Sequence, residues 1–240
     1  MSEMLPPIDP STPPPPSAPP SASPLPWEAP DAKLKAIFPT VVEFVRRPLA
    51  AYGRMSLAVD LVRPIAYFVA LILIKVIIEV AWSLPQHGKL VETYRTTLEQ
   101  MGQGAMWEQI APYLNRPGLL YTVLVVASPL IYLILLFVWA GLVHLSGSVL
   151  GASSAGFSGT LRVIAYAATA GVASIIPFVG GLVGLIWFLV LTMIGLSVVH
   201  RADGWKAALA TLAPLLICCL CCAGVTAFSI FVAGQSLTPR

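Results

Sequence analysis

Two charged side chains interrupt the first long apolar run of the chain. Lys75 and Glu79 lie near the middle of the stretch from Pro64 to Leu84. Because they are four residues apart, they share one face of a helix. A charge at this depth of a bilayer is costly unless it is paired or faces a polar interior. We expect the pair to point into a helix bundle, where it either holds the helices in register or serves as an ion relay or polar substrate site.

Two histidines close other apolar runs. His144 and His200 each follow a stretch long enough to cross a membrane, and the expected topology brings them near Asp60, Arg201 and Asp203. Such a cluster could bind a metal ion or a phosphate-bearing headgroup. Histidines at helix C-termini are also ordinary partners of the helix dipole. Since the sequence has no ligand motif such as two histidines four apart, they are weak metal candidates, and we expect no cofactor.

The four cysteines form one short cluster, Cys218, Cys219, Cys221 and Cys222. Overlapping C-x-x-C pairs are typical of soft-metal or redox sites. This run contains no histidine or carboxylate, so we expect the cysteines to pack as small apolar side chains of a buried helix. The chain also has no Ser-His-Asp order and no phosphate-binding loop. We therefore predict a protein that is not an enzyme.

The composition defines the class of protein. Hydrophobic residues make up 57% of the 240 residues and charged residues only 10%, which is outside the range of soluble domains. A net charge of +3 without a basic stripe argues against nucleic acid as a partner. We predict an all-α, polytopic membrane helix bundle in contact with the lipid bilayer.

The stretch from Leu161 to His200 is about twice as long as one bilayer crossing requires. Pro177, Gly180 and Gly181 allow a tight reversal, which predicts an antiparallel hairpin of helices 161–176 and 182–199. The pair Gly180 and Gly184 suits close helix packing, either within the chain or between copies in a homo-oligomer.

The apolar runs predict a membrane domain over residues 59–232. Its five spans are expected at about 64–84, 119–143, 161–176, 182–199 and 207–231. A polar loop over 85–118 separates the first two spans, and 233–240 form a C-terminal tail.

The amino-terminal part is of a different composition. Residues 1–30 are rich in proline, serine and alanine, and we predict a disordered tail. Residues 31–58 mix bulky apolar side chains with lysine and arginine, which predicts basic amphipathic helices in the headgroup layer, interrupted at Pro39 and Pro48. Their arginines would contact anionic lipid.

Lysine and arginine counts predict the orientation. Nine lie on the side of the amino-terminal segment and four on the opposite side. The amino terminus is therefore expected in the cytoplasm and, with five spans, the carboxyl terminus outside.

Several segments resemble a known family. They are HLSGSVLG at His144–Gly151, TLRVIAYA at Thr160–Ala167, IPFVGGLVGLIW at Ile176–Trp187 and GLSVVHRADGWKAALA at Gly195–Ala210. The sequence resembles the Yip family of five-span membrane proteins, named as interactors of Ypt/Rab GTPases, and its PWE segment and basic lead-in resemble the bacterial branch. The resemblance implies a fold and a membrane location but no defined bacterial activity.

Two positions depart from the pattern of the eukaryotic relatives. Their Asp-Leu-Tyr-Gly-Pro motif corresponds to residues 60–64, where Asp60, Leu61 and Pro64 are kept and the Tyr-Gly centre is lost. This departure argues against a Rab-type partner. A Ser-x-Pro break of the third span is replaced by residues 168–170, Ala-Thr-Ala, which predicts a straighter helix.

These observations favour a membrane adaptor or organiser that recruits protein partners or lipids through its cytoplasmic face. The residues expected on that face are Asp60, Leu61, Pro64, His144, Arg162, His200 and Asp203. The alternatives are a small transporter or channel that uses Lys75 and Glu79, and a metal-dependent enzyme at the two histidines. We expect a bacterial inner membrane, or a Golgi- or ER-type membrane if the source is eukaryotic.

Overall fold

A computed structural model of the chain describes residues 23–31, 34–58 and 60–236, with side chains up to residue 226. All regular elements within these residues are helices, which confirms the predicted all-α fold. The predictions for residues 1–22 and 237–240 lie outside the described part of the chain.

The lead-in segment forms the short η1 (Leu34–Ala36), α1 (Ile37–Arg46) and α2 (Pro48–Arg54). Pro48 begins α2, whereas Pro39 lies in the first turn of α1, where a missing N–H does no harm, so the predicted break at Pro39 is wrong. Phe44 and Tyr52 are fully or almost fully buried. The segment is therefore part of the folded core as well as a surface.

Residues 23–31 are also packed against this core. Leu25 is completely buried and Glu28 is 5% exposed. The predicted disordered tail over 1–30 is thus too long, because the buried side chains of Leu25 and Glu28 attach its last residues to the core.

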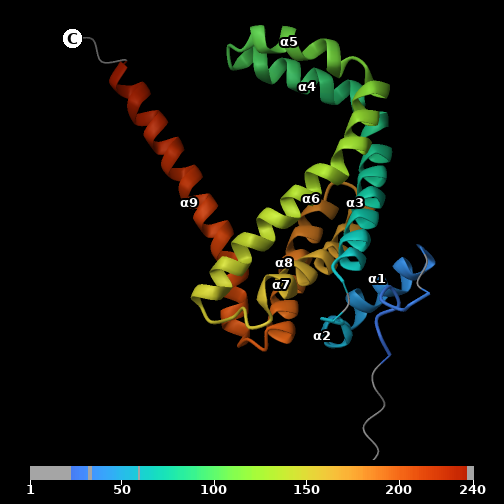
Figure 1. Cartoon of the computed structure of the whole chain (residues 1–240). Coiled ribbons are helices and arrows are strands. Elements are labelled where there is room, and N and C mark those ends of the chain that lie inside the picture. The colour runs from blue at the N-terminus through green and yellow to red at the C-terminus, as the bar shows by residue number, and fades with distance from the viewer. Residues whose placement is uncertain (1–22, 32–33, 59, 237–240) are drawn as a thin grey trace, which may run out of the picture.

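The first long helix, α3 (Val62–Ser83), continues through η2 (Leu84–Gln86) into α4 (His87–Gln100), which pairs with α5 (Gly104–Leu114). The stretch predicted as a polar loop is therefore helical, and an Arg95–Glu99 ion pair one turn apart supports α4. Figure 1 shows the α4–α5 hairpin at the end of the molecule opposite α1 and α2.

The centre of the bundle is α7 (Gly156–Ala167) with η3 (Ala168–Ile175), reached through α6 (Pro117–Val149). All residues from Gly159 to Ala170 are buried. The segment predicted to form a straighter helix is not one continuous α-helix, because α7 tightens into a 3-10 helix at Ala168. This stretch includes Gly171 and the β-branched Thr169 and Val172, which favour the α-helix weakly. Thr169 is also hydrogen-bonded by Tyr67 at 2.8 Å.

The chain then reverses and returns as α8 (Gly180–Val199), which packs against η3 and α7. The predicted hairpin is present, although α8 begins at Gly180. A Cβ atom at Gly180 would lie 2.2 Å from the carbonyl oxygen of Ala173, so only glycine fits this reversal. Phe178 completes the turn with a φ of 65°, which is strained for a bulky side chain.

The last helix, α9 (Gly204–Ser236), contacts α6 near its start and then leaves the bundle (Figure 1). Within the described residues four helices are long and apolar enough to cross a membrane, at Val62–Gln100, Pro117–Val149, Gly180–Val199 and Gly204–Thr226. The expected span 161–176 is not among them, since α7 and η3 divide it into two short helices.

An aromatic cluster joins the lead-in helices to the bundle. The ring of Tyr166 stacks on Phe44 at 5.3 Å and packs against Tyr67 at 5.1 Å between ring centroids. Tyr52 donates a hydrogen bond to the carbonyl of Val163. These contacts fix α1 and α2 to α7 and to the first turns of α3. The PWE segment and Arg162, which are discussed below, lie at this end of the bundle.

Candidate functional site

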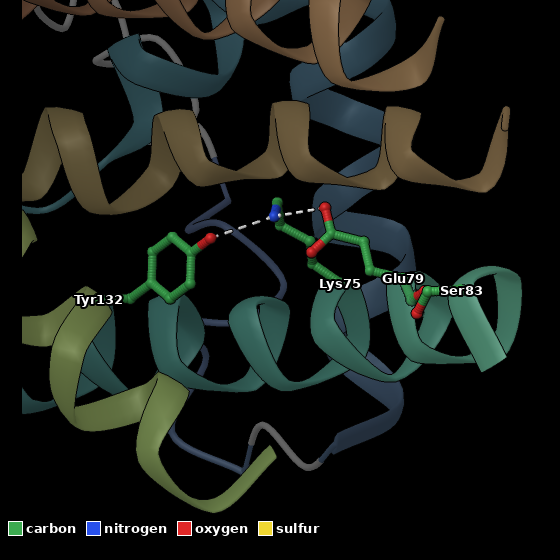
Figure 2. A network of polar contacts seen from close by, with 4 residues as sticks. All are labelled: Lys75, Glu79, Ser83 and Tyr132. Atoms are coloured by element: carbon green, nitrogen blue, oxygen red, sulfur yellow. Dashed lines mark hydrogen bonds and ion pairs between the residues drawn. The ribbon is translucent and has the colours of Figure 1, made fainter. Parts of the chain in front are cut away.

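The Lys75–Glu79 pair lies between α3 and α6. Lys75 Nζ donates to Glu79 Oε1 at 2.6 Å and to the hydroxyl of Tyr132 at 3.3 Å, as Figure 2 shows. The ammonium also lies 5.2 Å from the centroid of the Tyr132 ring. Ser83, drawn beside them, donates to the backbone carbonyl of Glu79 rather than to its carboxylate. The two charges are thus neutralised locally, and Tyr132 is a third partner that helix periodicity does not reveal.

The small residue Gly171 of η3 makes room for the lysine. A Cβ atom there would lie 3.4 Å from Lys75 Cδ, so the aliphatic stem of the lysine packs over the backbone of the central helix. The side chain of Lys75 is 22% exposed and that of Glu79 is 45% exposed. The pair was expected to point into the helix bundle, but both side chains remain partly exposed and are not enclosed in its interior.

Lys75 borders an apolar cleft of ≈ 430 Å³, which we call the lateral cleft. Its walls come from α3, α6, α7, η3 and α8 and include Phe68, Ile72, Leu136, Trp139, Ile164 and Phe188. Lys75 and Tyr132 are among its few polar lining groups. Such a site suits an apolar ligand with one polar end.

A second hollow of ≈ 450 Å³ adjoins the lateral cleft, and we call it the polar mouth. It lies between the end of α3, α4 and the 176–179 turn, and its lining includes Glu79, Ser83, Gln86, Lys89 and Thr93. Ser174 and Gly181 line both hollows. The Lys75–Glu79 pair therefore lies where an almost wholly apolar space meets a more polar one.

The two predicted histidines are brought together at the opposite end of the bundle. His200 Nδ1 accepts the backbone N–H of Ala155 at 3.0 Å, so the neutral ring carries its hydrogen on Nε2, which donates to Thr160 Oγ1 at 3.0 Å. The Thr160 hydroxyl can then donate to His144 Nδ1 at 3.1 Å. Thr160, which sequence reasoning missed, is the link between the two rings.

This geometry uses both nitrogens of His200 in hydrogen bonds to protein. Burial, and secondarily the neighbouring His144, lowers the pKa of His200 to about 4. Among the described residues no group of three or more His, Cys, Asp or Glu side chains could hold a metal ion. The arrangement is that of a hydrogen-bonded structural pair.

The other residues predicted for this face have separate partners. Arg162 is buried and donates to the carbonyl of Ser56 at 2.9 Å, whereas Asp203 pairs with Lys206 at 3.1 Å. Pro64 is buried, Leu61 is half-buried against the core and Asp60 is exposed. They lie at the same end of the molecule but do not form one cluster.

Glu28 is a second polar residue at this end that sequence reasoning did not single out. Its carboxylate accepts the hydroxyl of Tyr166 at 2.9 Å and the backbone N–H of Ser56 at 2.8 Å. Trp27 Nε1 donates to the carbonyl of Arg63 at 2.7 Å, and Arg63 donates back to the carbonyl of Glu28 at 2.7 Å. The PWE segment is thus a clamp between the lead-in helices and the bundle.

The four cysteines all lie on the surface of α9. The predicted burial within the protein is wrong, because α9 leaves the bundle before it reaches Cys218.

The long apolar helices and the apolar outer surface define an integral, multi-pass membrane protein. The Yip1 domain family model matches residues 42–226, more than half of the chain, and the protein therefore belongs to this family. Neither curated proteins nor solved structures match the sequence.

Proposed function

We propose that the protein is a non-enzymatic membrane organiser whose lead-in helices hold an anionic membrane surface and present a docking face to protein partners. One observation carries this proposal. A stripe of exposed apolar side chains runs along η1, α1 and α2, formed by Leu34, Phe38, Val45 and Leu49, which are between 47% and 75% exposed. Lys35, Arg46 and Arg47 flank it.

Within α1, Phe38 and Val45 are two helical turns apart on one face, while Thr40 and Phe44 on the other face are buried in the core. Leu34 of η1 and Leu49 of α2 extend the stripe at its two ends. An apolar stripe bordered by basic residues is the pattern of a helix lying in the headgroup layer. Because the buried face fixes the helices to the bundle, the stripe is held at a constant height relative to the spans.

The chain is long enough to cross the membrane five times if α7 and η3 together count as one span. The 12 residues of α7 and the 8 of η3 together extend about 34 Å at ~1.5 and ~2.0 Å per residue, enough for a ~30 Å hydrocarbon core. We propose that α7–η3 is the third span, enclosed by the others, and that the lead-in stripe lies on the cytoplasmic side with the α4–α5 hairpin outside.

The proposal predicts that the lead-in stripe enters anionic membranes. An environment-sensitive fluorophore on Phe38→Cys, in a chain without the four native cysteines, should shift to the blue in vesicles containing phosphatidylglycerol. Replacing Arg46 and Arg47 by glutamine should weaken this insertion, since each basic residue contributes about 1 kcal/mol at such a surface. The matched change of Arg95 and Arg116, at the other end of the molecule, should have no effect.

Docking of protein partners is tested separately by crosslinking in native membranes. Deleting residues 1–58 would remove Phe44 and Tyr52 from the core, so Phe38→Ser with Leu49→Ser is the cleaner variant. If the variant keeps every crosslinked partner, the docking face lies elsewhere and the proposal fails.

The transporter alternative rests on the Lys75–Glu79 pair beside the lateral cleft. Neutralising both residues should then abolish solute flux in reconstituted vesicles. The mostly apolar lining of the cleft favours the organiser, because a single neutralised pair offers no continuous polar path.

A further inference from the structure

The lateral cleft has rims that face outwards from the bundle. Leu135 and Val138 of α6 and Leu185 of α8 line it and are 51%, 53% and 52% exposed. Both helices are candidate membrane spans, so these rims contact hydrocarbon in a bilayer. The molecules that can reach the cleft from this side are therefore the acyl chains of lipids.

The floor of the lateral cleft is the central helix. Ile164 and Ala170 line it and are each 1% exposed. At ≈ 430 Å³ the cleft lies within the ~300–1,000 Å³ of ordinary ligand sites. It is thus a built, mainly apolar site that is open to the membrane along one side.

The polar mouth adds a charge preference. Lys75 lines the lateral cleft, and Lys89 and Glu79 line the polar mouth, so the two hollows together carry two positive charges and one negative charge. Lys89 forms no ion pair within the described residues. The lining therefore has one positive charge in excess, which is complementary to a headgroup with a single net negative charge.

We propose that the lateral cleft binds one acyl chain of an anionic phospholipid, whose phosphodiester lies at the polar mouth within reach of Lys75 and Lys89. Acyl chain and headgroup would then cross the junction at Ser174 and Gly181, which line both hollows. The polar mouth lies beside α4, at the opposite end of the molecule from the lead-in stripe (Figure 1), and the proposal is independent of the organiser function.

Native mass spectrometry of the detergent-purified full chain tests this proposal. Titration with phosphatidylglycerol should show one tightly held lipid per chain, with a dissociation constant at least about tenfold lower than for phosphatidylcholine. Lys89→Gln should remove this difference between the two lipids without affecting folding, because Lys89 is exposed. Equal binding of both lipids to the unmodified chain would overturn the proposal.

A pair of glycine variants tests the place of binding. A Cβ atom at Gly181 meets nothing within 4 Å, so the side chain of Gly181→Phe has room to fill the junction of the two hollows. Gly141 of α6 is equally open but does not line the cleft. Gly181→Phe should weaken phosphatidylglycerol binding at least about tenfold, and Gly141→Phe should not. Unchanged phosphatidylglycerol binding to Gly181→Phe, in a protein whose unfolding temperature shows that it is folded, would refute the site. Loss of phosphatidylglycerol binding in the Phe38→Ser, Leu49→Ser variant would show that the site is not independent of the lead-in stripe.

Discussion

His200 illustrates how a buried polar residue ties stability to pH. The backbone amide of Ala155 donates to Nδ1, which must therefore stay unprotonated, and burial lowers the pKa of the ring to about 4 from its ordinary value of 6.5. Between these values the unfolded chain binds more protons than the folded one, so stability is complete above about pH 6.5 and falls as the pH drops towards 4.

The prediction is a decrease of the unfolding temperature in detergent between pH 7 and pH 4. His200→Gln, which cannot be protonated, should be less stable at pH 7 because it loses the hydrogen bonds of the imidazole ring, but its pH profile should be flatter. Parallel profiles for the two proteins would show that His200 does not cause the pH dependence.

The partner of a single residue was easiest to predict when it lay nearby in the sequence. Lys75 and Glu79 are one helical turn apart, so their pairing followed from periodicity alone. Glu28 and Tyr166 are 138 residues apart, and only the packed aromatic cluster brings them together. The same holds for Thr160, which reaches His200 because α7 and α8 are antiparallel.

At the scale of elements, the α7–α8 hairpin depends on one of two adjacent glycines. A Cβ atom at Gly180 would lie 2.2 Å from a backbone oxygen that cannot move aside, whereas the neighbouring Gly181 is open. Gly180→Ala should therefore destabilise the protein by at least about 1–3 kcal/mol, the usual cost of overpacking.

Gly181→Ala is the matched control and should be neutral or slightly stabilising, since alanine favours a helix over glycine by about 0.5–1 kcal/mol. Chemical unfolding of both variants in the same detergent measures the difference. Equal stability would mean that the reversal adjusts to a side chain at Gly180.

The hairpin could be predicted because proline and glycine signals mark a reversal within one long apolar run. The stretch 85–118 could not be assigned in the same way, because its balanced charges are equally typical of a loop and of an exposed helix such as α4. The 3-10 character of η3 also left no clear signal, since Ala168 and its neighbours are small and their conformation depends on the helices around them.

For the whole molecule, composition alone indicated an all-α membrane protein, and the arrangement around α7 depends on contacts that composition does not describe. The central helix carries Arg162 and Tyr166 within an apolar run, which is explained by their hydrogen-bond partners in the protein and not by the surrounding lipid. In α9 the sequence is misleading in the opposite direction. Its outer half is as apolar as a core helix but extends away from the bundle (Figure 1).

The helices are also of unequal length. α8 has 20 residues and is about 30 Å long, which matches a hydrocarbon core of ~30 Å, whereas α6 and α9 each have 33 residues and are about 50 Å long. Two helices of that length cannot lie parallel to the membrane normal beside α8 and keep all of their apolar surface within the hydrocarbon core. Their divergence in Figure 1 is a way to accommodate this hydrophobic mismatch.

Bilayer thickness should therefore control the angle between α6 and α9. Spin labels on Val126 and Leu220, both 72% exposed, should move apart when the protein is transferred from long-chain to short-chain lipids. A distance that does not change with acyl-chain length would show a rigid splay. If it changes, membranes of different thickness would hold the same chain in different shapes, and the protein would sort towards the thickness at which its long helices tilt least.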